Sequence, residues 1–401
     1  MRRFYGIICF VALLSLAACK GSRDYPVSLS KSLVETGPET FTCSVEVETD
    51  GAWTAEARGA NGFRINWITL SPSSGNGRAT LTVTIKENST FEARTAVVSV
   101  TSESGNKASL RVRQDVEFID TEERIKARIG SFNLRISPDT DYDTGDGWDL
   151  RKDRVISAIK SNDFDVFGMQ EVSGPGNGGI IKDAMQKDLV AELGDVYEFR
   201  FFSPYSQSGN GGSANGLAFK KDKFTMSGYK FFWLSENPDV MVKNDGTHSR
   251  GGTCAVFTHK TTGVQFFFMA THAPLDKEVN VKLAYLYPEL EKKYNTGLLP
   301  SFLVGDMNNY QGSDASITYR TWWNDAYMVL SGQGKTIGPS GTFNGFNVSA
   351  DMNTRGRIDY IYYRGAATPL VYKCDDTLYD GHYPSDHLPI YCDFIINASQ
   401  N

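Results

Sequence analysis

The stretch Ser301-Phe302-Leu303-Val304-Gly305-Asp306-Met307-Asn308 leads from an apolar run directly into a glycine, a carboxylate and an amide. A short apolar run bounded by polar residues is typical of a buried strand. Further along the chain, Ser385-Asp386-His387 adds a carboxylate and a histidine just before another apolar run. Such groups beside strands indicate a rigid, preorganised site.

Four other apolar runs of the second half carry a polar residue of the same kind. They place Asn133 after residues 129–132, Glu171 after 166–169, His272 after 264–270, and Asp359 within 357–363. Taken singly, each residue has an ordinary structural explanation, such as a helix cap, a turn or a satisfied core histidine. Taken together, they favour a functional site, and we expect them at one edge of a sheet.

The donor atoms of this set indicate the cofactor. Carboxylate and amide oxygens suit Mg²⁺, with Mn²⁺ as the alternative, and Mg²⁺ takes few protein ligands beside water and substrate phosphate. The motifs of other hydrolases are missing from the sequence: it has no His-Glu-x-x-His, no Gly-x-Ser-x-Gly and no Cys-x-x-Cys. Gly334-Lys335-Thr336 lacks the upstream glycine of a phosphate-binding loop.

These blocks, in this order, resemble the endonuclease/exonuclease/phosphatase superfamily, also called deoxyribonuclease I-like. The resemblance covers residues 128 to about 395 and includes Trp148 with Arg151, the run Phe232-Trp233-Leu234-Ser235, and Arg250. It implies an α+β fold, a four-layer α/β/β/α sandwich. Helices are expected at residues 149–160 and 277–293, where the apolar pattern has a helical period.

The resemblance also implies a role for each residue. Glu171 would bind Mg²⁺, with Asn133 as a second ligand or a close neighbour, and Asp306 would orient or deprotonate the attacking water. Asn308 would hold the phosphate, and His272 would stabilise the charge that develops on the phosphoryl group. His387 beside Asp386 would complete the acid/base set, and Asp359 would support a histidine or a metal. His248 and Arg250 lie in a loop that either contacts substrate or is merely solvated. Asp276 is two positions late for the family pattern and inherits no role.

Residues 27–116 have a different pattern, with short β-type runs at 41–47, 79–85, 96–100 and 109–112. Turn-rich clusters separate the runs, so we expect a small antiparallel, immunoglobulin-like β-sandwich. Three segments of this region resemble the BACON domain, a family named for carbohydrate binding. They are Gly51-Ala52-Trp53-Thr54, Trp67-Ile68-Thr69-Leu70-Ser71-Pro72 and Val112-Arg113-Gln114. Trp53 and Trp67 either stack on a sugar or, as is commoner in small sandwiches, belong to the core.

The N-terminus resembles a bacterial lipoprotein signal. Arg2 and Arg3 precede an apolar stretch too short for a bilayer span, and Leu16-Ala17-Ala18-Cys19 is similar to a lipobox. We expect a signal peptide over 1–18, lipidation of Cys19, a tether over 19–26, a linker over 117–127 and the second domain over 128–397. The protein would be exported and held by its lipid anchor, in the outer membrane by the analogy that Lys20 provides.

Composition narrows the choice of partner. The 401 residues are 40% hydrophobic and 22% charged, with a formal net charge of −6. The acidic net charge does not indicate general electrostatic binding to nucleic acid, although nucleic acid stays open as a substrate. An exported chain permits disulfides, and Cys374 with Cys392 is the candidate pair, which the sequence leaves open.

The sequence therefore predicts an exported Mg²⁺-dependent phosphoesterase that acts on a phosphate-ester substrate, with phosphodiesters favoured over phosphomonoesters. The alternative is a surface glycan-binding lipoprotein whose second domain is catalytically idle. The intact set from Asn133 to His387 argues for the enzyme, because an idle domain would be free to lose such residues.

Overall fold

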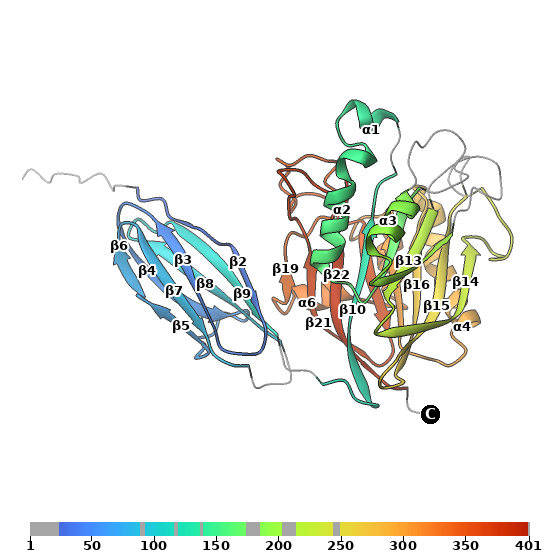
Figure 1. Ribbon diagram of the computed structural model, residues 1–401, viewed down its shortest axis with the longest axis horizontal. Coiled ribbons are helices and arrows are strands. Elements are labelled where there is room, and N and C mark those ends of the chain that lie inside the picture. Colours follow the sequence, from blue (N-terminus) through green and yellow to red (C-terminus); the bar gives the residue numbers. More distant parts are fainter. Residues whose placement is uncertain are drawn as a thin grey trace, which may run out of the picture. The chain divides into compact units, whose positions relative to one another are not determined.

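A computed structural model describes residues 24–88, 93–115, 119–136, 139–173, 185–202, 214–243 and 249–399. The chain divides into two compact units near residue 115 (Figure 1). The predicted signal peptide, Cys19 and His248 lie outside the described residues. Within the described residues, no helix is both long and apolar enough to cross a membrane.

The first unit is a β-sandwich of two sheets. One sheet has the order β1-β3-β7-β5 and the other β2-β9-β8-β4-β6. The strands are β1 Ser28–Leu29, β2 Leu33–Thr36, β3 Phe41–Glu48, β4 Ala52–Gly59, β5 Ile68–Ser71, β6 Ser74–Asn76, β7 Ala79–Ile85, β8 Arg94–Ser102 and β9 Lys107–Gln114. The expectation of a purely antiparallel sandwich is wrong in one place, because β2 pairs with β9 in parallel.

Alternation of side chains builds the core of this unit. On β7 and β8 every second residue is buried, which turns Val83 and Val98 into an apolar layer between the sheets. Trp53 belongs to the same core and is 2% exposed, and its indole Nε1 donates to the carbonyl of Gly77 at 3.0 Å. Trp53 is therefore a core residue and not an open sugar-stacking platform.

The second unit contains two larger sheets. The seven-stranded sheet has the order β12-β13-β11-β10-β22-β21-β19, and the six-stranded sheet β14-β15-β16-β17-β20-β18. The strands are β10 Arg124–Asn133, β11 Val166–Val172, β12 Tyr197–Phe202, β13 Ala214–Lys220, β14 Phe224–Trp233, β15 Gly251–His259, β16 Gln265–His272, β17 Ser301–Asp306, β18 Asn324–Asp325, β19 Thr336–Ile337, β20 Asp359–Arg364, β21 Ala367–Cys374 and β22 Ile390–Asn397.

The described part of this unit contains six helices, which lie beside the two sheets (Figure 1). They are α1 Asp139–Asp143, α2 Trp148–Asn162, α3 Met185–Leu193, α4 Lys277–Tyr294, α5 Asp314–Tyr319 and α6 Ala326–Ser331. Residues of α2 and α3 pack against β10 to β12 in one core, and residues of α4 and α5 pack against β14 to β17 in another. A third core, with Ile129 and Phe268, lies between the sheets. The predicted four-layer α/β/β/α sandwich is confirmed, as are both predicted helices.

Cys374 and Cys392, the candidate pair, do not form a disulfide. Both thiols are free, although their strands β21 and β22 are neighbours. In the register of this pair Cys374 lies opposite Ile390 and Cys392 opposite Tyr372. Diagonal neighbours on adjacent strands stand about 7–8 Å apart, farther than a disulfide can span.

Candidate active site

The predicted site residues converge from two sheets rather than one. Asn133 ends β10 and Glu171 lies on β11, both in the seven-stranded sheet, and Asp386 and His387 come just before β22 of the same sheet. His272, Asp306 and Asp359 belong to β16, β17 and β20 of the six-stranded sheet. The expectation of one sheet edge is therefore wrong, and the facing edges of two sheets form the site. We call these seven residues the polar edge.

Strand register places the three residues of the six-stranded sheet side by side. The parallel pair β16–β17 sets His272 opposite Asp306, and the antiparallel pair β17–β20 sets Asp306 opposite Asp359. Directly paired residues on adjacent strands keep their side chains about 5 Å apart. The apolar runs that precede His272 and Asp306 therefore fix the separation of the two polar groups.

The amide of Asn133 joins the two sheets. Its Nδ2 is 3.3 Å from Glu171 Oε1 on the neighbouring strand and 3.1 Å from Asp306 Oδ2 in the other sheet. The same nitrogen lies 3.4 Å from Nε2 of His387. Since Asn133 is fully buried, these contacts form without competition from bulk water. The amide thus marks the centre of the polar edge.

Local backbone geometry positions Glu171 of the polar edge and the nearby Asn308. Glu171 has a φ of 58°, at the point where the register between β11 and β13 shifts. Asn308 has a φ of 47°, its backbone N–H donates to Asp306 Oδ1 at 2.9 Å, and its Nδ2 donates to the carbonyl of Ala273 at 2.8 Å. Residues other than glycine seldom adopt this conformation, and such strain concentrates at functional sites.

A carboxylate–histidine pair lies next to Asn133. His387 Nδ1 donates to Asp359 Oδ2 at 2.9 Å, while its Nε2 lies 3.7 Å from Asp306 Oδ2. Burial opposes the charge on the imidazole, but Asp359 and Asp306 outweigh it and raise the pKa of His387 well above its usual 6.5. At neutral pH His387 is therefore a cation that faces Asp306.

Asp306 is the carboxylate whose pKa moves toward neutrality. The pKa of Asp306 is raised to about 7, chiefly by burial and also by Asp359 and Glu171, although His387 and the backbone N–H of Asn308 lower it. The pKa of Asp386 is also raised, first by burial. A general base works best when its pKa lies near the working pH, which suits Asp306 to take a proton from water.

The pKa of His272 is shifted in the opposite direction from that of His387. Burial, followed by the charges of Arg250 and His387, lowers the pKa of His272 well below 6.5, so the ring is neutral at pH 7. Its Nε2 lies 3.5 Å from Asp306 Oδ2, and Nη1 of Arg250 lies 3.0 Å from its Nδ1. The structure therefore brings Arg250 to the polar edge, and one histidine there is charged while the other is neutral.

Arg135 and Asp141, which the sequence did not single out, support the site. Arg135 has a φ of 56°, and its guanidinium pairs with Asp141 at 2.9 Å and lies 3.8 Å from Asp386 Oδ2. No periodic pattern marks Arg135 or Asp141, because both follow the end of β10. Arg151 of α2 is fully buried and donates to the carbonyls of Leu134 and Arg135, which fixes the same turn from behind.

The donor set fits a divalent cation in two arrangements. Asp306, Asp359 and His387 each offer a ligand atom within 4.8 Å of the others, and Asp359 Oδ1 is buried without a hydrogen-bond partner. Alternatively, partly exposed Glu171 and buried Asn133 offer hard oxygens from neighbouring strands. In the second arrangement Asn133 Oδ1 already accepts from the N–H of Arg135 at 3.0 Å and Glu171 Oε2 from the N–H of Ile136 at 3.1 Å, but each oxygen keeps a further lone pair. Protonated His387 has no lone pair to offer a cation, which favours the second arrangement.

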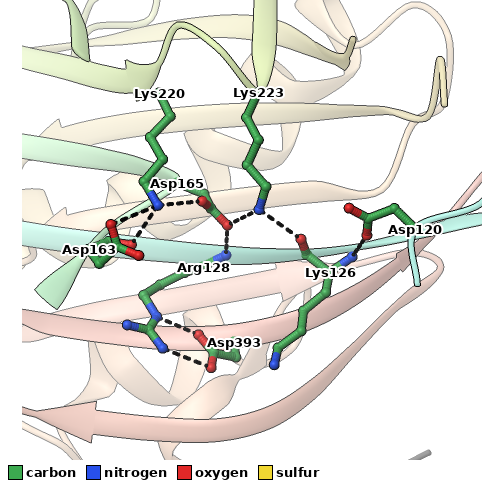
Figure 2. Close-up of a pocket in the computed structure, with 8 residues that line it drawn as sticks. All are labelled: Asp120, Lys126, Arg128, Asp163, Asp165, Lys220, Lys223 and Asp393. Carbon is green, nitrogen blue, oxygen red and sulfur yellow. Dashed lines mark hydrogen bonds and ion pairs between the residues drawn. The ribbon is translucent and has the colours of Figure 1, made fainter. Parts of the chain in front are cut away.

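A second charged cluster lies at the opposite ends of the strands and serves structure. Figure 2 shows a pocket of about 260 Å³ lined by four acidic and four basic residues, Asp120, Lys126, Arg128, Asp163, Asp165, Lys220, Lys223 and Asp393. Asp165 is paired with Lys220 at 3.1 Å and Lys223 at 2.8 Å, and Asp393 with Arg128 at 2.7 Å. Opposite charges compensate one another there, in contrast to the polar edge.

Asp276, which departs from the family pattern, has a structural role. Its carboxylate caps α4 and accepts hydrogen bonds from the backbone N–H groups of Glu278 and Val279 at 2.9 and 3.0 Å.

The comparisons with known proteins agree with this geometry. The N-terminal residues 52–115 match the BACON family, described as an N-terminal binding domain. A solved endonuclease/exonuclease/phosphatase from Bacteroides vulgatus is 28% identical with a TM-score of 0.59, and one from Bacteroides thetaiotaomicron is 25% identical with a TM-score of 0.57. Both cover 68% of this chain and 99% of their own.

Among curated proteins, mouse nocturnin is 24% identical over 278 residues, which are 62% of this chain and 59% of nocturnin. This chain therefore spans less than two thirds of that relative. Residues 130–387, which contain the whole polar edge, match the endonuclease/exonuclease/phosphatase family model. The chain belongs to the endonuclease/exonuclease/phosphatase family.

Proposed function

We propose that this protein is a phosphoesterase that depends on Mg²⁺ or Mn²⁺ and attacks phosphorus directly with water. The observation that carries the proposal is the amide of Asn133, which contacts Glu171 and Asp306 from opposite sheets and faces His387. Around this amide lie the proposed base Asp306, the protonated imidazole of His387 and the carboxylate of Glu171. Positioning and charge neutralisation are what phosphoryl transfer requires of a protein.

The side chains divide the work by their protonation states. Asp306, with its pKa near 7, orients the attacking water and takes its proton. His387, kept protonated by Asp359, faces the charge that develops on the phosphoryl oxygens. His272 is neutral and supplies a hydrogen bond to the same group, and Asn308 holds the phosphate.

Glu171 and Asn133 are the residues that we propose to hold the cation. Bound there, it would neutralise charge on the phosphate and on the carboxylates around it. Without it, the carboxylates raise one another's pKa, as Glu171 does for both Asp306 and Asp386. A donor set of this kind suits Mg²⁺ or Mn²⁺ rather than zinc.

Phosphodiesters are the favoured substrates because cationic groups are few at this site. Among the described residues, protonated His387 and Arg250 face the cluster, whereas Arg135 is paired with Asp141. A diester carries a single negative charge, so it needs less neutralisation than a monoester dianion.

Export and lipidation at Cys19, with an outer-membrane location, complete the proposal and rest on residues 1–20 of the sequence. The first domain then serves as a spacer or contacts a glycan. Trp53 does not supply that contact because it is buried, whereas Trp67 is only partly buried. The alternative of an idle second domain finds less support, since the chain keeps all seven residues of the polar edge and folds them into one site.

The test compares hydrolysis of bis(4-nitrophenyl) phosphate and 4-nitrophenyl phosphate with Mg²⁺, with Mn²⁺ and with a chelator. We expect the diester to be the better substrate, and we expect Asp306→Ala to lose about 100-fold or more of the cation-dependent rate. Asp222→Ala, an exposed turn residue, is the matched control and should keep the rate. Full cation-dependent activity in Asp306→Ala would sink this mechanism.

A further inference from the structure

An apolar groove of about 760 Å³ lies between α4 and the segment that follows β14. Leu234 and Leu283 at its base belong to the core between the six-stranded sheet and its helices. We call it the α4 groove. Its lining includes Val240 and Val242 on one wall and Val279, Tyr285 and Leu286 of α4 on the other.

Both walls of the α4 groove are joined to the polar edge by short links. On one wall, the backbone N–H of Leu234 donates to the carbonyl of Arg250 at 2.9 Å, and the guanidinium of Arg250 lies 3.0 Å from His272. On the other wall, α4 starts from its cap at Asp276, four residues after His272. Both walls of the groove are therefore linked, by one backbone hydrogen bond and by four residues of chain, to the side of the site that carries His272.

The lining suits an aliphatic group better than a base or a sugar. Its apolar side chains are leucines and valines, with Tyr285 as the single aromatic lining residue, whereas bases are held by stacking on aromatic side chains. The Ser235 hydroxyl is engaged within its own wall, where it donates to the carbonyl of Val240 at 2.8 Å. Sugars require free, fixed polar groups, and Ser235 does not offer one.

The exposed side chains of the rim point to the same conclusion. Val240, Val242 and Tyr285 are 49%, 38% and 56% exposed, and Leu275 near the start of α4 is 67% exposed. A contiguous exposed apolar surface marks a binding site more often than chance. The charges beside it, Glu236, Lys282 and Glu289, have mixed signs and make no positive path for a polyanion.

We propose that the α4 groove holds the aliphatic chain of an amphiphilic phosphate ester whose phosphate lies at the polar edge. The inference rests on the proposed function and narrows it to phosphate esters with a long alkyl or acyl chain. Arg250 and His272 then stand between the chain and the reacting phosphate. Long-chain esters should be better substrates than short-chain esters with the same phosphate chemistry.

The test is a series of alkyl 4-nitrophenyl phosphate diesters, from methyl to octyl, kept below their micelle concentrations. We expect kcat/KM to rise on the order of 100-fold from methyl to octyl, since an open groove covers about half of the added methylene surface. The double variant Val240→Gln with Val242→Gln should reduce this octyl-to-methyl ratio at least fivefold. Val190→Gln on α3, which is also 49% exposed, is the matched control and should keep the ratio.

Equal kcat/KM across the series, or a ratio that the double variant leaves unchanged, would overturn the proposal. A binding arm separates this outcome from failure of the proposed function. Asp306→Ala protein is titrated with dodecyl phosphate and with butyl phosphate by calorimetry. Suppose that no ester is hydrolysed, but that dodecyl phosphate binds more tightly than butyl phosphate and that the double variant abolishes this difference in affinity. The proposed enzymatic function then fails, while the proposed role of the groove in binding an aliphatic chain is supported.

Discussion

The carboxylate of Asp359 lies 2.9 Å from Nδ1 of His387, and the other nitrogen of that ring faces Asp306. Asp359 starts β20 of the six-stranded sheet, whereas His387 comes just before β22 of the seven-stranded sheet. One hydrogen bond thus links the two sheets and sets the charge of the imidazole. The protonation of His387 is therefore a property of how the sheets pack.

Asp359→Asn should lower the rate by about 100-fold or more, because His387 loses the partner that orients and charges it. The raised pKa of His387 keeps it protonated at neutral pH, so wild-type activity should fall only as the pH rises through that raised value. In the variant the pKa drops, and the alkaline limb of the pH–rate profile should move to lower pH.

The control for this variant is Asp325→Asn, which removes a buried ion pair with Arg357 on the same sheet, 2.6 Å in length. It should destabilise the protein yet leave the alkaline limb in place. If Asp359→Asn also left that limb unmoved, the proposed role of the pair would be wrong.

Glu171→Gln should raise the Mg²⁺ concentration needed for half-maximal activity by about tenfold or more, because it removes a proposed ligand carboxylate. The measurement is a cation titration of activity, together with direct Mn²⁺ binding by calorimetry. Asp359→Asn should leave Mn²⁺ binding intact. The reverse result, with binding lost in Asp359→Asn and kept in Glu171→Gln, would assign the cation to the cluster of Asp306, Asp359 and His387.

The layers of the fold could be predicted because apolar runs and helical periods are local signals. Residues 301–306 form β17, and the expected helix at 277–293 is α4. The division of strands between two sheets could not be predicted, since it depends on pairings such as β10 with β22 across more than 250 residues. The disulfide between Cys374 and Cys392 could not be judged from the sequence for the same reason, because it depends on the register between β21 and β22.

The site was predictable as a set of residue types at strand ends, and its geometry was not. Asn133 and Asp306 were found because each follows an apolar run. Arg135 was missed because its position depends on a left-handed backbone turn and on Asp141, and neither has a sequence signature. Which histidine is charged also depends on neighbours from distant strands.

Asp165→Asn should lower the free energy of unfolding by about 2–4 kcal/mol, because it breaks buried pairs with Lys220 and Lys223 at the ends of the strands opposite the polar edge. Asp163→Asn is the matched control. Asp163 also pairs with Lys220, but its side chain is 66% exposed, so its loss should change stability by less than about 1 kcal/mol. Urea unfolding of the two variants measures the difference, and equal effects would contradict the assignment.

His259 provides a test of pH-dependent stability away from the polar edge. Burial, with help from Lys223, lowers the pKa of His259 below 6.5, although Asp120 and Asp165 oppose the shift. As the pH falls through 6.5, His259 therefore becomes protonated in the unfolded chain while it stays neutral in the folded chain. The contribution of His259 is fully present above pH 6.5 and is lost as the pH falls through 6.5 toward the lowered value.

His259→Gln removes this contribution and isolates it from other groups that titrate in the same range, such as Asp306. The free energy of unfolding is measured by urea titration of both proteins between pH 7.5 and 5.5. The stability advantage of wild type over the variant should be largest at pH 7.5 and should shrink on acidification. An advantage that stays constant or grows toward pH 5.5 would show that burial beside Phe224 does not hold His259 neutral.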